Sequence, residues 1–141
     1  MKRPFVLACV VCCLIVGCDS RSDLEKLQGA WKLQVMHGEF DFGLPGSKGG
    51  IPILTFSGGA FTCEDDETHA KVEGTFTCDP SKEPKQITFT YSGRTVVAIY
   101  DIRRDAMQIC VGKDDHVPPD DFAGGPRSRP ALLIFDRLEA P

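Results

Sequence analysis

The sequence lacks the short motifs around which many catalytic sites are built. It contains no Gly-x-Ser-x-Gly elbow, no His-Glu-x-x-His pair and no glycine loop of the kind that cradles a phosphate. The histidines His37, His69 and His116 fall in predicted loops or at predicted strand ends, and none has a suitably spaced partner. We therefore expect a protein that is not an enzyme, with no catalytic residue and no cofactor.

Clustered positive charge is also missing. The 141 residues include 16 Lys and Arg against 20 Asp and Glu, which gives a net charge of −4. Removal of a leader that contains Lys2 and Arg3 leaves 14 basic against 20 acidic residues, a net charge of −6. Because nucleic-acid binding needs grouped Lys and Arg to neutralise phosphates, we expect no nucleic-acid partner. The length indicates a single domain.

The acidic residues are grouped, but they do not follow a known metal motif. Residues 64–69 read Glu-Asp-Asp-Glu-Thr-His, which lacks the spacing and the glycine of an EF-hand loop. Further acidic residues lie at 114–115, followed by His116, and at 120–121. A cation site is the alternative for each group, but we interpret them as solvated loop charges and predict no metal.

Cysteine is scarce once the leader is set aside. Four of the seven cysteines lie at or before position 18, and three remain: Cys63, Cys78 and Cys110. A Cys63–Cys78 disulfide would close a loop worth about 3 kcal/mol. However, a hairpin centred on residues 67–68 sets Cys63 opposite Val72, which leaves Cys78 about 20 Å farther along the strand. We therefore predict free thiols that are buried or half-buried.

The first 23 residues are typical of a bacterial lipoprotein leader and its tether. Lys2 and Arg3 precede an uncharged run over 5–17 that is too short, at about 20 Å of helix, to span a bilayer. Ile15-Val16-Gly17-Cys18 resembles a lipobox, which implies cleavage after residue 17 and lipidation of Cys18. We expect residues 1–17 to be a signal peptide and 18–23 a lipidated cysteine with its tether. A plain secretory signal and an uncleaved anchor are the alternatives.

This interpretation makes the membrane the first predicted partner, bound through lipid on Cys18. The domain would face the periplasm or the exterior of the cell envelope, on a leaflet that the sequence leaves open. Two or three acyl chains hold a protein firmly on a bilayer, because each buried CH₂ contributes about 0.8 kcal/mol.

The rest of the chain alternates as β-strands do. Apolar and polar residues alternate between turn-forming segments, with a long Pro- and Gly-rich charged loop over 113–130. The predicted strands are 31–36, 51–56, 60–64, 71–78, 86–91, 95–103, 106–111 and 131–138, after a short helical turn at 23–28. We predict an all-β fold, an antiparallel up-and-down barrel of about eight strands, because closure removes exposed sheet edges.

Hairpin register supports a meander. A turn at 93–94 sets Phe89 opposite Ala98 and Tyr91 opposite Val96, and a turn at 104–105 sets Tyr100 opposite Ile109 and Ile102 opposite Met107. All of these residues belong to predicted inward faces, so the pairing and the hydropathy pattern agree.

The barrel interior is the main candidate for binding. Candidate lining residues are Phe61, Phe76, Phe89, Tyr91, Tyr100 and Met107. They form either a packed core or an apolar pocket, and the small inward residues Gly74 and Ala98 would leave some room.

The segments 23–32, 73–82, 99–101 and 107–110, with Phe122 and 132–137, resemble a family of small uncharacterised domains abundant in planctomycetes. The resemblance covers about residues 23–138, implies a lipocalin-like barrel and brings no established activity. Gly29-x-Trp31 is similar to the signature of the first lipocalin strand, and Arg137 matches the arginine that packs over that tryptophan. The resemblance thus implies a barrel plug of Gly29, Trp31 and Arg137, in a domain over 24–138. The loop over 43–50 departs from the lipocalin pattern.

We expect the protein to bind a small hydrophobic ligand. The alternative is a packed barrel that acts as an envelope protein–protein interaction module. A cavity above about 300 Å³ would favour the ligand, and a filled interior would favour the module.

Overall fold

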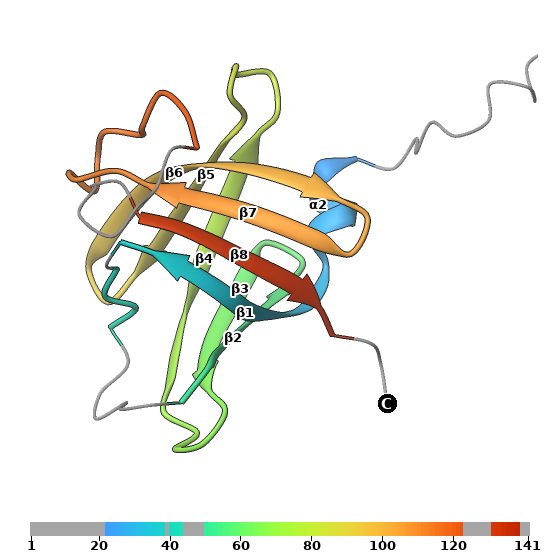
Figure 1. The fold of residues 1–141 in the computed structure, drawn as a ribbon, viewed down its shortest axis with the longest axis vertical. Helices are drawn as coiled ribbons and strands as arrows, with labels where there is room; N and C mark the ends of the chain where they lie inside the picture. The colour runs from blue at the N-terminus through green and yellow to red at the C-terminus, as the bar shows by residue number, and fades with distance from the viewer. Residues whose placement is uncertain (1–21, 39, 44–49, 123–130, 139–141) are drawn as a thin grey trace, which may run out of the picture.

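The computed structural model describes residues 22–38, 40–43, 50–122 and 131–138. The predicted signal peptide, Cys18 and most of the predicted tether lie outside the described residues. One short helix, α2 (Asp23–Leu27), precedes eight strands (Figure 1). The strands are β1 (Gly29–His37), β2 (Pro52–Ser57), β3 (Ala60–Asp65), β4 (Lys71–Asp79), β5 (Gln86–Tyr91), β6 (Arg94–Arg103), β7 (Ala106–Val111) and β8 (Ala131–Arg137).

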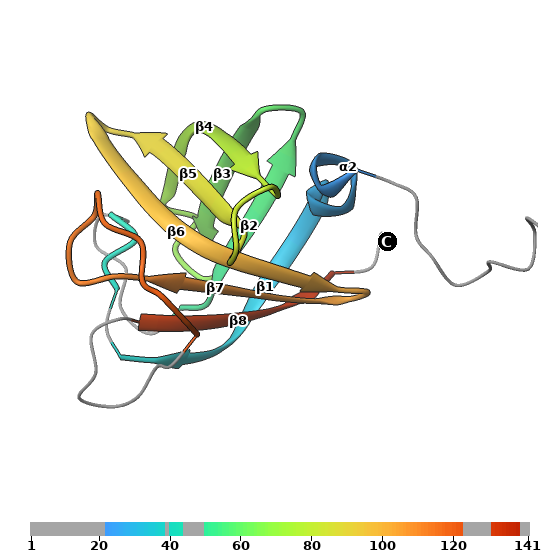
Figure 2. The same cartoon turned by 90° about the horizontal axis from the view of Figure 1, so that it is seen from above.

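The strands form a closed antiparallel barrel in chain order. Each strand pairs with its neighbours along the chain, and β8 pairs with β1 to close the sheet (Figure 2). The predicted fold, an eight-stranded lipocalin-like up-and-down barrel with an N-terminal helical turn, is confirmed. None of the helices in the described part of the chain is long and apolar enough to cross a membrane.

Three of the five predicted register relations hold, and the two across the β5–β6 hairpin are wrong. Cys63 pairs with Val72, and both relations across the β6–β7 hairpin are observed. Between β5 and β6, however, Phe89 pairs with Val96 and Tyr91 with Arg94. The turn consists of Ser92 and Gly93, whose φ angles of 48° and 73° fit the two-residue hairpin turn that matches strand twist. The partner moves by two positions, so every side chain keeps its predicted face.

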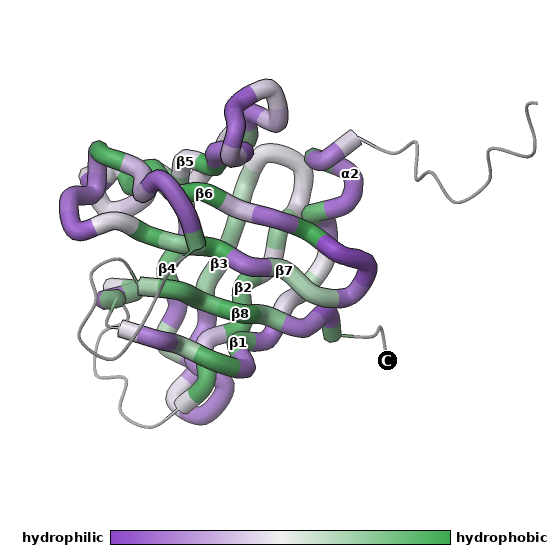
Figure 3. The backbone as a smooth tube through the Cα atoms, turned by 45° about the horizontal axis from the view of Figure 1, so that its top comes forward, coloured by the Kyte–Doolittle hydropathy of each residue, from purple (hydrophilic) through white to green (hydrophobic). Residues whose placement is uncertain are grey.

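The core fills the barrel with aromatic and aliphatic side chains. Along β7, for example, a hydrophilic segment interrupts the hydrophobic ones, as expected for a strand with one face inward (Figure 3). Phe56 packs against Phe76 with ring centroids 4.7 Å apart, and Phe61 packs against Phe89 at 5.1 Å. Such edge-to-face pairs stabilise a core beyond their buried area.

Gly74 does not leave room in the barrel, contrary to the sequence-based expectation. A Cβ atom built at Gly74 would collide with the backbone of Thr90 and lie 2.9 Å from the Phe61 ring. The missing side chain therefore lets Phe61 lie against the sheet, and the space is already filled.

The three cysteines are free. Cys63 and Cys110 are buried, and Cys78 is half-buried. Burial, with a smaller effect from the charge of Asp65, raises the pKa of the Cys63 thiol to about 12. Burial likewise raises the pKa of Cys110 to about 11, so both thiols stay protonated and inert at neutral pH.

Candidate functional site

The two ends of the barrel are built from different connections. The α2 end consists of α2 and the connections 58–59, 80–85 and 104–105. The described connections at the mouth end are residues 38, 40–43, 50–51, 66–70, 92–93 and 112–122. Antiparallel strands joined in chain order place alternate connections at opposite ends, so the two groups do not mix.

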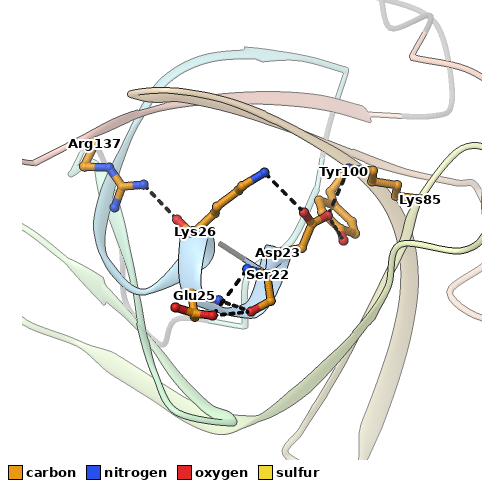
Figure 4. Close-up of polar contacts among 7 residues, drawn as sticks. All are labelled: Ser22, Asp23, Glu25, Lys26, Lys85, Tyr100 and Arg137. Carbon is orange, nitrogen blue, oxygen red and sulfur yellow. Dashed lines mark hydrogen bonds and ion pairs between the residues drawn. The ribbon is translucent and has the colours of Figure 1, made fainter. Parts of the chain in front are cut away.

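At the α2 end, a short helix is fixed by its cap. The Ser22 hydroxyl accepts a hydrogen bond from the Glu25 backbone N–H, and the Glu25 carboxylate accepts one from the Ser22 backbone N–H (Figure 4). This capping box satisfies N–H groups that a five-residue helix would otherwise leave unpaired. Leu27 is fully buried, so the helix covers the end of the core.

Trp31 fills the core beneath α2. Its side chain is fully buried, and its indole Nε1 donates to the Leu27 carbonyl oxygen at 2.8 Å. The Arg137 guanidinium carbon lies 4.1 Å from the Trp31 ring centroid. Its two terminal nitrogens donate to the backbone carbonyls of Lys26 and Gln28, each at 2.8 Å. Arg137 thus joins the last strand to β1 through a cation–π contact, and to α2 and its C-cap Gln28 through two charged hydrogen bonds.

Gly29 occupies the start of β1 for a conformational reason. Its φ of 108° lies in a region that other residues rarely adopt. A Cβ atom there would also lie 3.4 Å from a terminal nitrogen of Arg137. The glycine therefore lets the chain turn from α2 into β1 directly beside the guanidinium group.

A polar network completes the α2 end, and the sequence analysis missed it. Asp23 is only 9% exposed, and its carboxylate accepts a hydrogen bond from the Tyr100 hydroxyl at 2.7 Å (Figure 4). Lys85 places its Nζ 3.1 Å from the same carboxylate oxygen, and Lys26 lies 3.9 Å from the other. An aspartate in the first helical turn, directly after the capping serine Ser22, was the available signal.

The network shifts the pKa values of Asp23 and Tyr100. Burial by itself raises the pKa of Asp23, but the hydrogen bond from Tyr100 and the interactions with Lys85 outweigh it and lower this pKa. Burial, together with the bond to Asp23, raises the pKa of Tyr100 above its usual value. Asp23 is therefore a carboxylate and Tyr100 a neutral phenol at neutral pH, and the arrangement is structural.

Toward the mouth end lies a small apolar cavity of about 40 Å³. Its lining residues are Phe40, Phe42, Leu54, Phe61, Cys63, Phe89, Tyr91, Val96, Ile109, Val111, Leu133 and Phe135. Three of the six predicted lining residues contribute: Phe61, Phe89 and Tyr91. Phe76, Tyr100 and Met107 do not, although all three are buried in the core.

Two phenylalanines that the sequence analysis did not select cover this cavity. Phe40 and Phe42 follow β1, and their rings meet edge to face with centroids 5.1 Å apart. Both are half-buried and pack against the core cluster. The alternation Phe-Asp-Phe directly after a strand was the sequence signal that could have identified them.

Arg94 connects three segments at the mouth end. Its Nε and one terminal nitrogen donate to the two carboxylate oxygens of Asp115, at 2.6 and 3.0 Å. Its other terminal nitrogen donates to the Asp41 carbonyl at 3.0 Å and to the Tyr91 hydroxyl at 3.2 Å. The guanidinium carbon also lies 5.3 Å from the Phe40 ring centroid. Arg94 therefore holds the segment of Phe40 beside the β5–β6 turn and the loop that contains Asp115.

The acidic residues at 64–67 organise a turn. The Asp65 carboxylate is fully buried and accepts hydrogen bonds from the backbone N–H groups of Glu67 and Thr68, each at 2.9 Å. Asp66 accepts a bond from the Ile51 backbone N–H at 2.8 Å. Among the described residues, no three His, Cys, Asp or Glu side chains gather as metal ligands would.

Comparison of the chain with protein-family models, with curated proteins and with solved structures gave no match. The resemblance to the planctomycete domains accordingly stays a prediction from the sequence.

Proposed function

We propose that the protein is a lipoprotein of the cell envelope, anchored through lipid on Cys18, whose barrel is an interaction module. It faces the periplasm or the exterior and acts by binding rather than by catalysis. The mouth end is the docking surface. The observation that carries this proposal is the filled barrel interior, combined with exposed apolar side chains around the mouth.

The small volume of the barrel interior argues against a ligand of the size of a lipid. Small-molecule sites usually measure about 300–1,000 Å³. The cavity of about 40 Å³ is close to the space of one water molecule, and its lining is apolar. A barrel filled in this way is a rigid support for a surface, which is what a docking module requires.

The mouth end offers a surface with mixed chemistry. Four large apolar side chains there are more than a third exposed: Val35, Met36, Ile51 and Val117. The connections at the same end carry acidic residues, including Asp41, Asp66 and Asp114. Apolar side chains exposed at one end of the barrel favour an interaction site there, and negative charge selects a positive partner. The partner that fits is an envelope protein with apolar side chains among Lys and Arg.

The test uses photo-crosslinking in the native envelope. A benzophenone amino acid at Val117 should capture one defined partner, whereas the same group at Leu138, at the α2 end, should not. Met36→Asp should abolish that crosslink, and Leu138→Asp should leave it intact. Equal labelling from both ends, or none from Val117, would contradict the docking surface.

The lipid anchor is tested separately. The N-terminal peptide of the mature protein should carry an acylated glyceryl group on Cys18 by mass spectrometry. Cys18→Ser should abolish this modification and release the protein from membranes, while Cys78→Ser, as a matched control, should leave it bound.

A hydrophobic ligand is the second candidate, favoured by the wholly apolar lining beneath Phe40 and Phe42. A ligand larger than a few atoms would have to replace these two rings. Native mass spectrometry on the mature domain, purified from its own envelope without delipidation, would detect it as an extra mass lost on denaturation. Phe42→Ala should then strengthen binding; a bare mass for both proteins would favour the module.

A further inference from the structure

The point where the anchor meets the domain is fixed to one end of the barrel. Asp23 is held by Tyr100 and Lys85, and the carbonyl of Lys26 is held by Arg137 (Figure 4). These contacts join α2 to β6, to the connection before β5 and to β8. The first described residues therefore cannot leave the α2 end without breaking buried polar contacts.

The length of the tether limits how the barrel can sit on a membrane. Cys18 and Asp23 are five residues apart, so the chain between them spans at most about 18 Å. A nine-residue strand such as β1 is about 30 Å long, and the tilt of strands in a barrel reduces this to a height of about 21–25 Å. With the mouth against the bilayer, the α2 end would stand farther away than the tether reaches.

Charge favours the same arrangement. Among the described residues, the mouth-end connections hold seven carboxylates and one lysine: Asp41, Asp66, Glu67, Asp114, Asp115, Asp120, Asp121 and Lys113. The α2-end connections hold four of each sign: Asp23, Glu25, Glu83, Asp105, Lys26, Lys82, Lys85 and Arg104. Counted from the full sequence, the connections 38–51, 66–70, 92–93 and 112–130 hold eight acidic and four basic residues. An anionic bilayer therefore still repels these connections, and it is indifferent to the second group, within the screening length of the medium.

We propose that the α2 end is the membrane-facing surface of the protein and that the mouth end points into the aqueous space. This inference rests on the proposed lipidation of Cys18 and adds an orientation to it. The partner at the α2 end is the lipid headgroup layer. A partner or ligand at the mouth end then arrives from the aqueous side, since the bilayer does not reach it.

The single tryptophan, Trp31, makes the orientation measurable, because it lies at the α2 end. The full lipidated protein is placed in phosphatidylglycerol–phosphatidylethanolamine vesicles with a dansyl-labelled phospholipid. Energy transfer from Trp31 to the dansyl lipid should be severalfold stronger than in a variant whose tryptophan is at the mouth end, Trp31→Phe combined with Phe40→Trp. Equal or stronger transfer from the mouth end would overturn the orientation.

A second pair of variants avoids the risk that Trp31→Phe fails to fold. Leu24→Trp and Val117→Trp each add a tryptophan at an exposed site, one at each end, and both retain Trp31. Leu24→Trp should increase the transfer more than Val117→Trp does. The reverse order would again overturn the orientation.

The mass of the N-terminal peptide separates the two proposals. A protein that carries no lipid on Cys18 overturns both the anchor and the orientation. A lipidated protein with equal transfer from both ends overturns the orientation alone.

Discussion

The two ends of this barrel are closed in different ways. At the α2 end, Trp31 is fully buried, and Arg137, whose side chain is 25% exposed, donates to the backbone carbonyls of Lys26 and Gln28. At the mouth end, the rings of Phe40 and Phe42 remain half-exposed, and Arg94 and Asp115 are each about one-third exposed. Arginine lies over an aromatic ring at both ends and is partly exposed at both, but the ring beneath it is fully buried only at the α2 end.

The difference in solvent decides how much each contact stabilises the fold. The hydrogen bond from Tyr100 to the buried Asp23 carboxylate contributes about 1.5–3 kcal/mol, whereas a partly exposed ion pair such as Arg94–Asp115 contributes about 0–1 kcal/mol. The α2 end should therefore open only with global unfolding, and the mouth end should open locally at lower free energy. A surface that must admit a partner is expected at the less stable end.

Among the substitutions that test this contrast, Trp31→Ala should have the largest effect on stability. We expect a loss of about 3–5 kcal/mol in the free energy of unfolding, because the truncation leaves a cavity in a packed core. Chemical denaturation followed by circular dichroism measures it. Phe40→Ala, at the mouth end, should cost about 1 kcal/mol as the matched control. Equal losses would show that Trp31 does not stabilise the α2 end more than Phe40 stabilises the mouth end.

Arg137→Lys should have the next largest effect, a loss of about 2 kcal/mol. Lysine keeps the charge but cannot stack on Trp31 while it donates to two carbonyls in fixed directions. Arg103→Lys is the control, because that side chain is 83% exposed and should change stability by less than about 0.5 kcal/mol. Indistinguishable denaturation midpoints for the two variants would contradict the assigned role of Arg137.

Tyr100→Phe should lower stability by about 1–2 kcal/mol, because Asp23 loses its nearest donor within a buried site. It should also reduce the pH dependence. The pKa of Asp23 is lowered in the folded state, so its stabilisation is present above the unfolded pKa and is lost as pH falls through the folded pKa. Denaturation at several pH values between neutral and acid checks this. An unchanged acid dependence in Tyr100→Phe would contradict it.

Asp115→Asn should have the smallest effect, a loss of about 0.5–1 kcal/mol. Hydrogen bonds from Arg94, opposed by burial, lower the pKa of Asp115, so this contribution also disappears as pH falls through the folded value. Because the backbone N–H of Val97 donates to the Asp115 carbonyl, its amide hydrogen exchange should accelerate. The amide of Trp31 should exchange as in the wild type; acceleration at both ends would contradict local opening.

The barrel itself was predictable because the patterns that specify it lie within short segments of the sequence. Alternation of period two, turn residues and short connections define strands and hairpins, and neighbours along the chain are neighbours in the sheet. The error at the β5–β6 hairpin arose because Ser92 adopts a positive φ, which is less typical of serine than of glycine.

The closing contacts were not predictable, because they join distant residues. Tyr100 and Asp23 are 77 positions apart, and Arg94 lies 53 positions from the Asp41 carbonyl that it binds. No local pattern selects such partners. The same applies to the volume of the cavity, which depends on how Phe40 and Phe42 fold back over residues from other strands.

The sequence by itself determined the strand pattern, the inward faces and the predicted anchor at Cys18, since each depends on residues within one short segment. Tertiary structure alone decided which end of the barrel is closed by buried polar contacts, how little space remains inside and which apolar residues stay exposed at each end. The physical reason is that solvent exclusion and packing are properties of the assembled barrel, and the free energy of each contact depends on them.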